Sequence, residues 1–129
     1  MTKSALLDRF PILSIEITKN NTNYKSVPEI LNFFKTKIEE DELAKYIATF
    51  NHYEHTQSIE GSEIQEGMLD AQNIIFCFGK KLSNAKVLAV RPRSIGISEY
   101  QDKFIVSLME APMVPMTDKM EAWVKELSK

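Results

Sequence analysis

The amino-acid sequence predicts a single α+β domain in which a small β-sheet is covered by helices. Segments with the apolar pattern of strands are separated by segments with helical spacing, in the order β-α-β-β-α-β-α. A chain of 129 residues is the size of one domain and can bury about two-thirds of its unfolded surface. We therefore expect one domain over residues 1–129, with residues 1–10 as an N-terminal arm or short helix.

The first half of the chain has the patterns of a strand, a helix and a second strand. Apolar and polar residues alternate near residues 11–19, which is the period of a half-buried strand. Ser26 and Glu29 then form a capping box, in which each side chain satisfies a free backbone N–H. A helix is expected to begin here and to end by Asp41. Residues 46–50 are rich in β-branched and aromatic side chains and predict the second strand.

The second half predicts two more strands with a short helix between them. Residues 73–78 are apolar at successive positions, which is typical of a central strand covered on both faces, and Gly79 ends it. Residues 83–90 predict a short helix, which ends before Pro92 because the residue before a proline avoids helical geometry. Residues 104–109 predict the last strand.

The C-terminal segment predicts a final helix with Thr117 as its cap and with Glu121 placed to pair with Lys125. Four methionines in this part of the chain are spaced four, three and four residues apart: Met109, Met113, Met116 and Met120. Thioethers bind Cu(I), so copper binding is one interpretation. We expect these flexible side chains instead to fill gaps between the last strand and the last helix.

Charge is distributed unevenly along a chain whose formal net charge is −2. Residues 54–70, here called the acidic block, contain five acidic residues and no Lys or Arg. Residues 71–98, here called the basic block, contain five basic residues and no Asp or Glu. We expect two solvated faces that pair with each other or with a second subunit. The acidic net charge argues against a nucleic-acid partner.

Other features predict a cytoplasmic protein without membrane contact. The longest apolar run, residues 74–78, is far shorter than the roughly 20 residues that span a bilayer. The N-terminal residues lack the long apolar stretch of a secretory signal. The single cysteine, Cys77, excludes an intrachain disulfide. It lies in the most apolar strand, so we expect a structural residue and no reactive thiolate.

The order of short motifs resembles that of a bacterial and archaeal family, domain of unknown function 302. Members have a strand ending in an acidic residue and His, then a strand ending in Phe-Gly, an Ile-Gly and another apolar strand. The matching segments here are Phe50-Asn51-His52, Ile75 to Gly79, Ile95-Gly96 and Phe104 to Val106. The resemblance covers roughly residues 11–110 and implies a related α+β fold. It implies no activity.

The only two histidines, His52 and His55, are three residues apart. Asn51 can cap a helix that begins at His52, and Glu54 completes the capping pattern. Both rings then lie on one face, so they can share a metal ion. A zinc site needs three or four ligands, and the others would have to come from the acidic block or Cys77. We expect imidazoles at a helix start, with no native metal or cofactor.

The basic block offers a more specific site. Gly79-Lys80-Lys81 leaves the end of the predicted central strand, where ligands of open α/β sheets gather. Arg91 and Arg93 flank Pro92 and can bring planar donors to a carboxylate or phosphate at the same edge. We predict an anion site formed by these basic side chains, with His52 as a polar wall. Its members are Lys80, Lys81, Arg91, Arg93 and His52.

The predicted function is that of a homodimeric binding module for a small anionic ligand, without catalysis. One alternative is a structural or regulatory homodimer without ligand, in which the acidic and basic blocks meet across subunits. Another is a metal-binding protein, or a hydrolase or isomerase with His52 as general base. The enzyme would need a carboxylate such as Glu54 or Glu66 to orient the ring.

Overall fold

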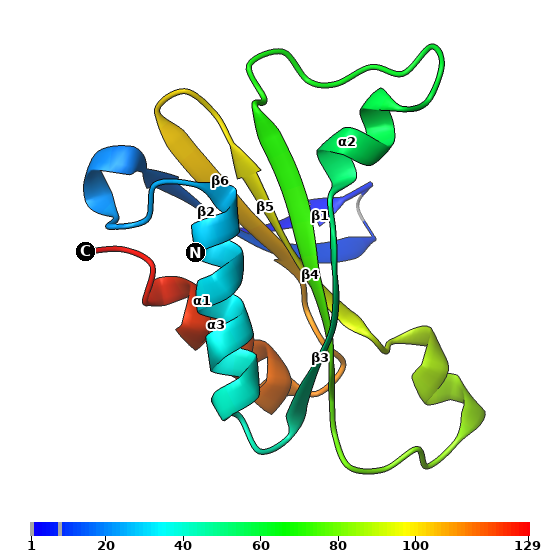
Figure 1. The fold of residues 1–129 in the computed structure, drawn as a ribbon. Helices are drawn as coiled ribbons and strands as arrows, with labels where there is room; N and C mark the ends of the chain where they lie inside the picture. The colour runs from blue at the N-terminus through cyan, green and yellow to red at the C-terminus, as the bar shows by residue number, and fades with distance from the viewer. Residues whose placement is uncertain (1, 8) are drawn as a thin grey trace.

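A computed structural model, which describes residues 2–7 and 9–129, contains one antiparallel sheet of six strands in the order β1-β2-β6-β5-β4-β3 (Figure 1). The strands are β1 (Thr2–Leu6), β2 (Phe10–Thr18), β3 (Ala44–Phe50), β4 (Asp70–Phe78), β5 (Arg93–Glu99) and β6 (Lys103–Met109). The helices are α1 (Val27–Glu40), α2 (His52–Gln57) and α3 (Val114–Lys125), with 3-10 segments η1 (Lys19–Asn21) and η2 (Ala85–Ala89). The single α+β domain is confirmed; the expected element order omitted β1, β5 and α2.

Most neighbours in the sheet are also neighbours in the sequence. β3, β4, β5 and β6 follow one another as antiparallel pairs, and β2 pairs with β6, so the first long strand lies beside the last. The connection from β2 to β3 must therefore cross the sheet, and α1 makes this crossing. α1 and α3 lie on the same side of the sheet (Figure 1).

The core lies between this face of the sheet and the two long helices. Phe76 and Phe78 of β4 pack on Trp123 of α3, with ring centroids 6.0 and 5.8 Å from the indole. Alternate strand residues and one stripe of each helix supply the rest of a single buried cluster, which includes Ile17, Val27, Ile30, Phe34, Ile38, Ile74, Ile95, Ile97, Phe104, Val106, Met120 and Val124. The opposite face of the sheet carries neither long helix, and we call it the open face.

The ends of α1 are fixed by the residues that the sequence indicated. The Ser26 hydroxyl accepts a hydrogen bond from the Glu29 N–H at 3.3 Å, and the Glu29 carboxylate accepts one from the Lys25 N–H at 2.8 Å. At the other end, Asp41 is the C-cap, and its carboxylate contacts the Lys119 ammonium on α3 at 2.7 Å. The capping box is confirmed, and Asp41 also connects the two long helices.

β4 is not a central strand covered on both faces. Ile74, Phe76 and Phe78 are buried, whereas Ile75 and Cys77 on the open face are only partly buried. β4 lies next to the edge strand β3. A continuous apolar run indicates two covered faces only where helices occupy both sides, and here they occupy one. Cys77 is therefore less buried than expected.

Two strands were missed in the sequence. In β5, Arg93, Ile95 and Ile97 are buried and alternate with smaller residues, so the strand period is present. This period was overlooked because Gly96 is a poor strand former and because Arg93, a charged residue, occupies a position on the core face. In the first ten residues, expected as an arm or short helix, β1 pairs antiparallel with β2.

The last helix begins earlier than predicted. α3 starts at Val114, with Pro115 in the first turn, where a missing N–H costs nothing. Thr117 lies inside the helix, and its buried hydroxyl accepts a hydrogen bond from the Ala111 N–H at 2.9 Å. Thr117 is therefore not the cap; it ties the helix to the segment after β6. The predicted pair of Glu121 with Lys125 is confirmed at 3.3 Å.

Among the residues that the structure describes, none of the helices has both the length and the apolar character needed to cross a membrane.

Truncating a core ring tests the one-sided packing. We expect Phe76→Ala to reduce the free energy of unfolding by about 3–5 kcal/mol, because it removes contacts with Phe78 and Trp123 and leaves a cavity. Leu88, which is 62% exposed, is the matched control, and Leu88→Ala should change the free energy of unfolding by about 0.5 kcal/mol or less. Urea unfolding followed by circular dichroism measures both; equal losses would contradict this packing.

The Asp41 contact predicts a pH dependence. Burial alone would raise the pKa of Asp41, but hydrogen bonds from Lys119 and the backbone N–H groups of Leu43 and Ala44 outweigh it, so the pKa lies below 3.8. The stabilisation is complete above about pH 5 and is lost as the pH falls from about 4 through the lower folded pKa. In urea unfolding at pH 7, we expect Asp41→Asn to have a free energy of unfolding lower than that of the wild type by on the order of 1 kcal/mol. In acid the two free energies should become equal, because the wild-type carboxylate is then protonated. A difference that persists at pH 2 would contradict this assignment.

Candidate functional site

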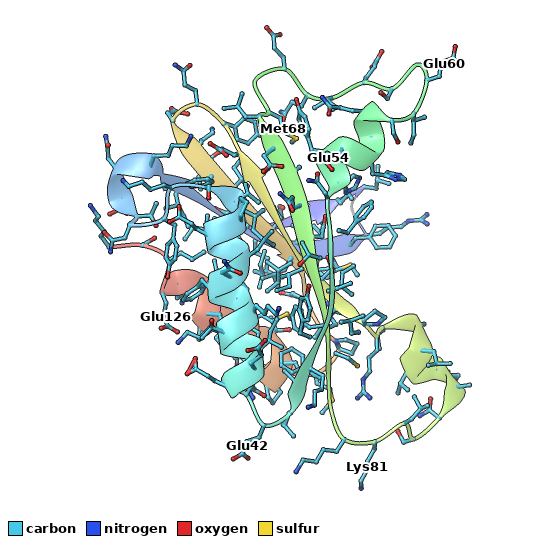
Figure 2. The ribbon with its side chains drawn as sticks, viewed as in Figure 1. Glu42, Glu54, Glu60, Met68, Lys81 and Glu126 are labelled. Atoms are coloured by element: carbon cyan, nitrogen blue, oxygen red, sulfur yellow. The ribbon has the colours of Figure 1, made fainter. Side chains whose placement is uncertain are left out.

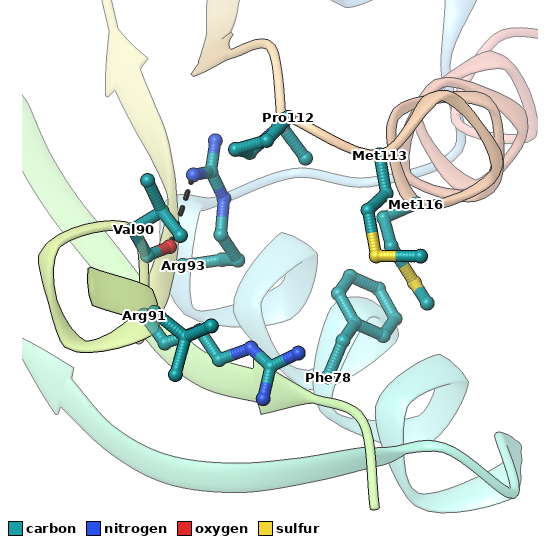
Figure 3. A pocket seen from close by; sticks show the side chains of 9 residues that line it. Phe78, Val90, Arg91, Arg93, Pro112, Met113 and Met116 are labelled. Carbon is teal, nitrogen blue, oxygen red and sulfur yellow. Dashed lines mark hydrogen bonds between the residues drawn. The ribbon is translucent and has the colours of Figure 1, made fainter. Parts of the chain in front are cut away.

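A pocket lies beside the end of β4 and the beginning of β5, next to the first turn of α3 (Figure 3). It holds about 130 Å³. Its lining residues are Phe78, Val87, Val90, Arg91, Arg93, Ala111, Pro112, Met113 and Met116. The end of β4, the segment from η2 to β5 and the segment from β6 to α3 contribute these side chains. Two arginines are the only charged residues among these nine, and we call this site the arginine pocket.

Arg93 places a buried cation in the arginine pocket. It is only 8% exposed, because it is the first residue of β5 and points to the core face, as Ile95 does. Nη1 donates to the Val90 carbonyl at 3.1 Å and Nη2 to the Met109 carbonyl at 2.6 Å, whereas Nε is buried without a partner. Burial lowers the pKa of the Arg93 guanidinium. No carboxylate in the described part of the chain pairs with it.

Arg91 lies against the backbone turn that follows β4. The turn residue Gly79 has a φ of +103°, and a Cβ added there would lie 2.9 Å from Nη2 of Arg91. Nη1 of Arg91 donates to the Lys81 carbonyl at 2.7 Å. Glycine is thus needed for the backbone conformation and for the close approach of the guanidinium. Gly79 and the Lys81 carbonyl together position Arg91, and Figure 3 shows its guanidinium beside Phe78.

The two lysines of the predicted anion site do not line the arginine pocket. Lys80 and Lys81 are exposed in the loop after β4, and Figure 2 shows the Lys81 side chain at the outer edge of the molecule. The Lys81 backbone carbonyl, which is not part of the pocket lining, accepts the hydrogen bond from Arg91. The structure therefore brings Arg91 and Arg93 into one site and leaves both lysine side chains in solvent.

His52 lies at the other end of the sheet. It follows Phe50, which pairs with Asn73 near the start of β4, whereas Gly79 follows the last residue of that strand. Asn73 and Gly79 are six residues apart on this extended strand, or roughly 20 Å, so His52, contrary to the prediction, is not a wall of the pocket that holds Arg91 and Arg93. His52 instead lines a shallower depression formed by α2 and the loop before β4, together with Tyr53, Thr56, Glu63, Ile64, Gln65, Met68 and Ala71.

The two histidines do form the predicted helix start. Asn51 caps α2, and its side-chain oxygen accepts from the Glu54 N–H at 3.0 Å. The rings of His52 and His55 both contact Phe50, with centroids 5.1 Å away, and lie 6.2 Å from each other. Within residues 2–7 and 9–129, no group of three or more His, Cys, Asp or Glu side chains could hold a metal ion.

The geometry does not assemble the acid–base pair considered for an enzyme. Neither imidazole is hydrogen-bonded to Glu54 or Glu66 in the described structure. The carboxylate that shares a depression with His52 is that of Glu63, which the sequence did not single out. An isolated imidazole near a carboxylate lacks the fixed orientation that a general base requires.

The methionine series divides between the core and the arginine pocket. Met120 is fully buried and Met116 packs against the core, as expected for gap-filling side chains. Met113 is 54% exposed, and with Met116 it lines the arginine pocket opposite the arginines. The pocket therefore has two thioethers on one side and two guanidinium groups on the other.

The acidic and basic blocks do not pair within the chain. No ion pair among the described residues joins one block to the other. Figure 2 shows Glu54 and Glu60 at one end of the molecule and Lys81 at the opposite end. β4 begins at the last residue of the acidic block and forms the first part of the basic block, so this extended strand separates the acidic side chains from Lys80 and the basic residues after it.

The whole chain, residues 1–129, matches a family described as a family of unknown function, DUF6858. The chain belongs to the DUF6858 family. No curated protein and no solved structure matches it.

Membership in DUF6858 corrects the resemblance to domain of unknown function 302, which is not the family that matches. The structure supplies the reason. Ile95-Gly96 lies inside β5, and Phe78-Gly79 marks the end of β4. An apolar residue followed by glycine is common wherever a strand ends or a neighbouring backbone approaches closely, so the order of such pairs does not identify a family.

The arginine pocket of this DUF6858 protein contains two guanidinium groups, which are hydrogen-bond donors, and no nucleophile or general base among its lining residues. The sequence identified its two arginines through their spacing around Pro92. It did not identify Phe78, Met113 or Met116 as walls, because their contact depends on how α3 packs beside the end of β4. The regular spacing of the methionines was the one feature of the sequence that pointed to the segment containing Met113 and Met116.

Gly79 should control the position of Arg91. We expect Gly79→Ala to lower the free energy of unfolding by about 1–3 kcal/mol, because the backbone has a positive φ and the new methyl group displaces the guanidinium. Gly61→Ala is a control with a positive φ and no atom within 4 Å of the added Cβ. In an Arg91→Ala background the cost of Gly79→Ala should fall to the level of the control, measured by urea unfolding. Equal costs in both backgrounds would show that Arg91 does not need Gly79.

Proposed function

We propose that this DUF6858 protein is a binding module for a small organic anion with an apolar body, held in the arginine pocket. The observation that carries the proposal is the Arg93 guanidinium, which is buried at the pocket wall with its Nε unpartnered and without a carboxylate partner in the described chain. A buried cation is costly unless an anion or hydrogen-bond acceptors satisfy it. A carboxylate ligand would supply both.

The walls favour an anion that carries an apolar group. Seven of the nine lining residues are apolar, and Phe78, Met113 and Met116 face the arginines (Figure 3). A cavity of about 150 Å³ is known to hold one benzene ring, so a pocket of about 130 Å³ suits a ligand body no larger than one ring. These dimensions support a small monocarboxylate over a nucleotide or another large polyanion.

The start of α3 adds to the positive potential. Its N-cap residue, Met113, lines the pocket, makes no side-chain capping bond and has no acidic residue near it in the first turn. The N-terminus of a helix carries a partial positive charge that favours a nearby anion. This end of the helix and the two guanidinium groups thus favour the same kind of ligand.

A cytoplasmic location is part of this proposal, on the ground of the single cysteine.

Isothermal titration calorimetry with three probes tests the ligand class. Benzoate offers both a carboxylate and an apolar ring, benzamide offers the ring alone, and inorganic phosphate offers the charge alone. We expect benzoate to bind at least about tenfold more tightly than either of the others, because a charge-assisted hydrogen bond to arginine and burial of the ring contribute together. Equal binding of benzoate and benzamide would contradict the proposal.

Variants locate the site. Arg91→Met, which removes the charge, and Arg93→Lys, which keeps the charge but removes Nε, should each weaken benzoate binding by about tenfold or more. Lys80→Met removes one positive charge from the adjacent exposed loop and should leave the affinity unchanged. If Arg93 serves only to connect η2 to the end of β6 through its two hydrogen bonds, Arg93→Lys will lower the stability without changing the affinity for benzoate. That result would contradict the proposed site.

A further inference from the structure

The strand residues of the open face carry few charges. Its strand residues include Ile12 and Ser14 of β2, Ile105 and Ser107 of β6, Ser94, Gly96 and Ser98 of β5, Asn73 and Ile75 of β4, and Ala48 of β3. Charged strand residues occur at its margins, where Glu16 pairs with Lys103 at 3.3 Å and Lys45 lies on the edge strand. A chain with 26% charged residues would be expected to place many of them on a solvated sheet face.

A row of small polar residues crosses the middle of the open face. The strand registers place Thr2, Ser14, Ser107, Gly96 and Asn73 side by side, each opposite the next on the neighbouring strand. These side chains are short, so the surface along the middle of the face is recessed relative to the longer side chains beside it. A shallow depression lined partly by residues of this row occupies that position.

Apolar residues border this row on one side. Ile12 pairs with Met109, and Leu6 pairs with Phe10, whose side chain points to the same face as Ile12. Leu6, Phe10 and Met109 are 59%, 44% and 42% exposed. Ile75, opposite Ser94, continues the apolar border toward β3. Large exposed apolar side chains gathered on an uncharged surface indicate an interaction site.

The dimensions of the open face suit a second sheet of the same size. Five of the six strands, spaced about 4.8 Å apart and counted as seven residues long at about 3.3 Å each, give a flat area of roughly 550 Å². Two such faces together bury roughly 1,100 Å², which exceeds the approximately 1,000 Å² that a specific interface needs. The middle of the face carries no charged strand residue, so two copies can approach there without repulsion between like charges. The short side chains of the polar row leave room for the apolar border residues of the partner.

We propose that the open face packs against the open face of a second copy of this chain, giving a symmetric dimer of two sheets. The twofold axis lies near the row of Ser107 and Gly96, and the apolar borders exchange contacts across it. Both arginine pockets remain accessible at the ends of the sheets. This interface differs from one in which the acidic and basic blocks meet, because it contains few ion pairs.

Analytical ultracentrifugation of the full chain over a range of concentrations tests the proposal. We expect a concentration-dependent dimer whose dissociation constant changes by less than about threefold between about 0.05 and 0.5 M salt. Ser107→Glu places like charges face to face across the axis and should weaken the dimer by on the order of 100-fold. Ser62→Glu makes the same change in the exposed loop after α2 and should have no effect.

Circular dichroism establishes that each variant is folded, and Ser94→Glu, at an exposed position on the same face, is a second variant if Ser107→Glu does not fold. A wild-type chain that stays monomeric at all concentrations overturns the proposal. A dimer that survives both substitutions also overturns it, and so does one that dissociates steeply with salt, which would indicate an interface between the charged blocks.

Discussion

The packing of α1 and α3 on one face of the six-stranded sheet is the interaction on which the other features depend. Phe76 and Phe78 meet Trp123 in this layer, and Asp41 joins the two helices at its rim. Because both helices lie on the same face, the opposite face is covered within the described chain only where α2 packs on Phe50, and the rest of it is available to solvent or to another molecule. Because α3 begins beside the last residues of β4, a gap remains between its first turn and that strand end, and the side chains of two connecting segments line it.

Arg93 is the residue at which the requirements of folding and of the proposed binding site conflict. It occupies a core position of β5, where the strand period calls for an apolar side chain such as that of Ile95. Two backbone carbonyls satisfy part of the guanidinium, and Nε remains unpartnered. A protein that needed only a stable core would gain by replacing a buried arginine with an apolar residue. Retaining the cation is consistent with a site whose ligand completes its coordination.

The site could be predicted from the sequence only in part. The spacing of Arg91 and Arg93 around Pro92 brought both into one prediction, and both line the same pocket. His52 was grouped with them because a linear sequence does not show that six residues of extended strand, from Asn73 to Gly79, separate the two regions. The lysines were included because charge alone does not tell whether a side chain faces a cavity or the solvent.

The sequence by itself determined the local structure: the capping box of α1, the Asn51 cap of α2 and the alternation of β2 are set by residues close in the chain. The tertiary structure decided what depends on partners far apart in sequence. It placed β1 and β5 in the sheet, left one face of β4 open, and moved the start of α3 upstream of Thr117, whose hydroxyl bonds to Ala111. The physical reason is that hydrogen bonds within a helix or a turn join near neighbours, whereas burial and sheet pairing are fixed only when the whole chain packs.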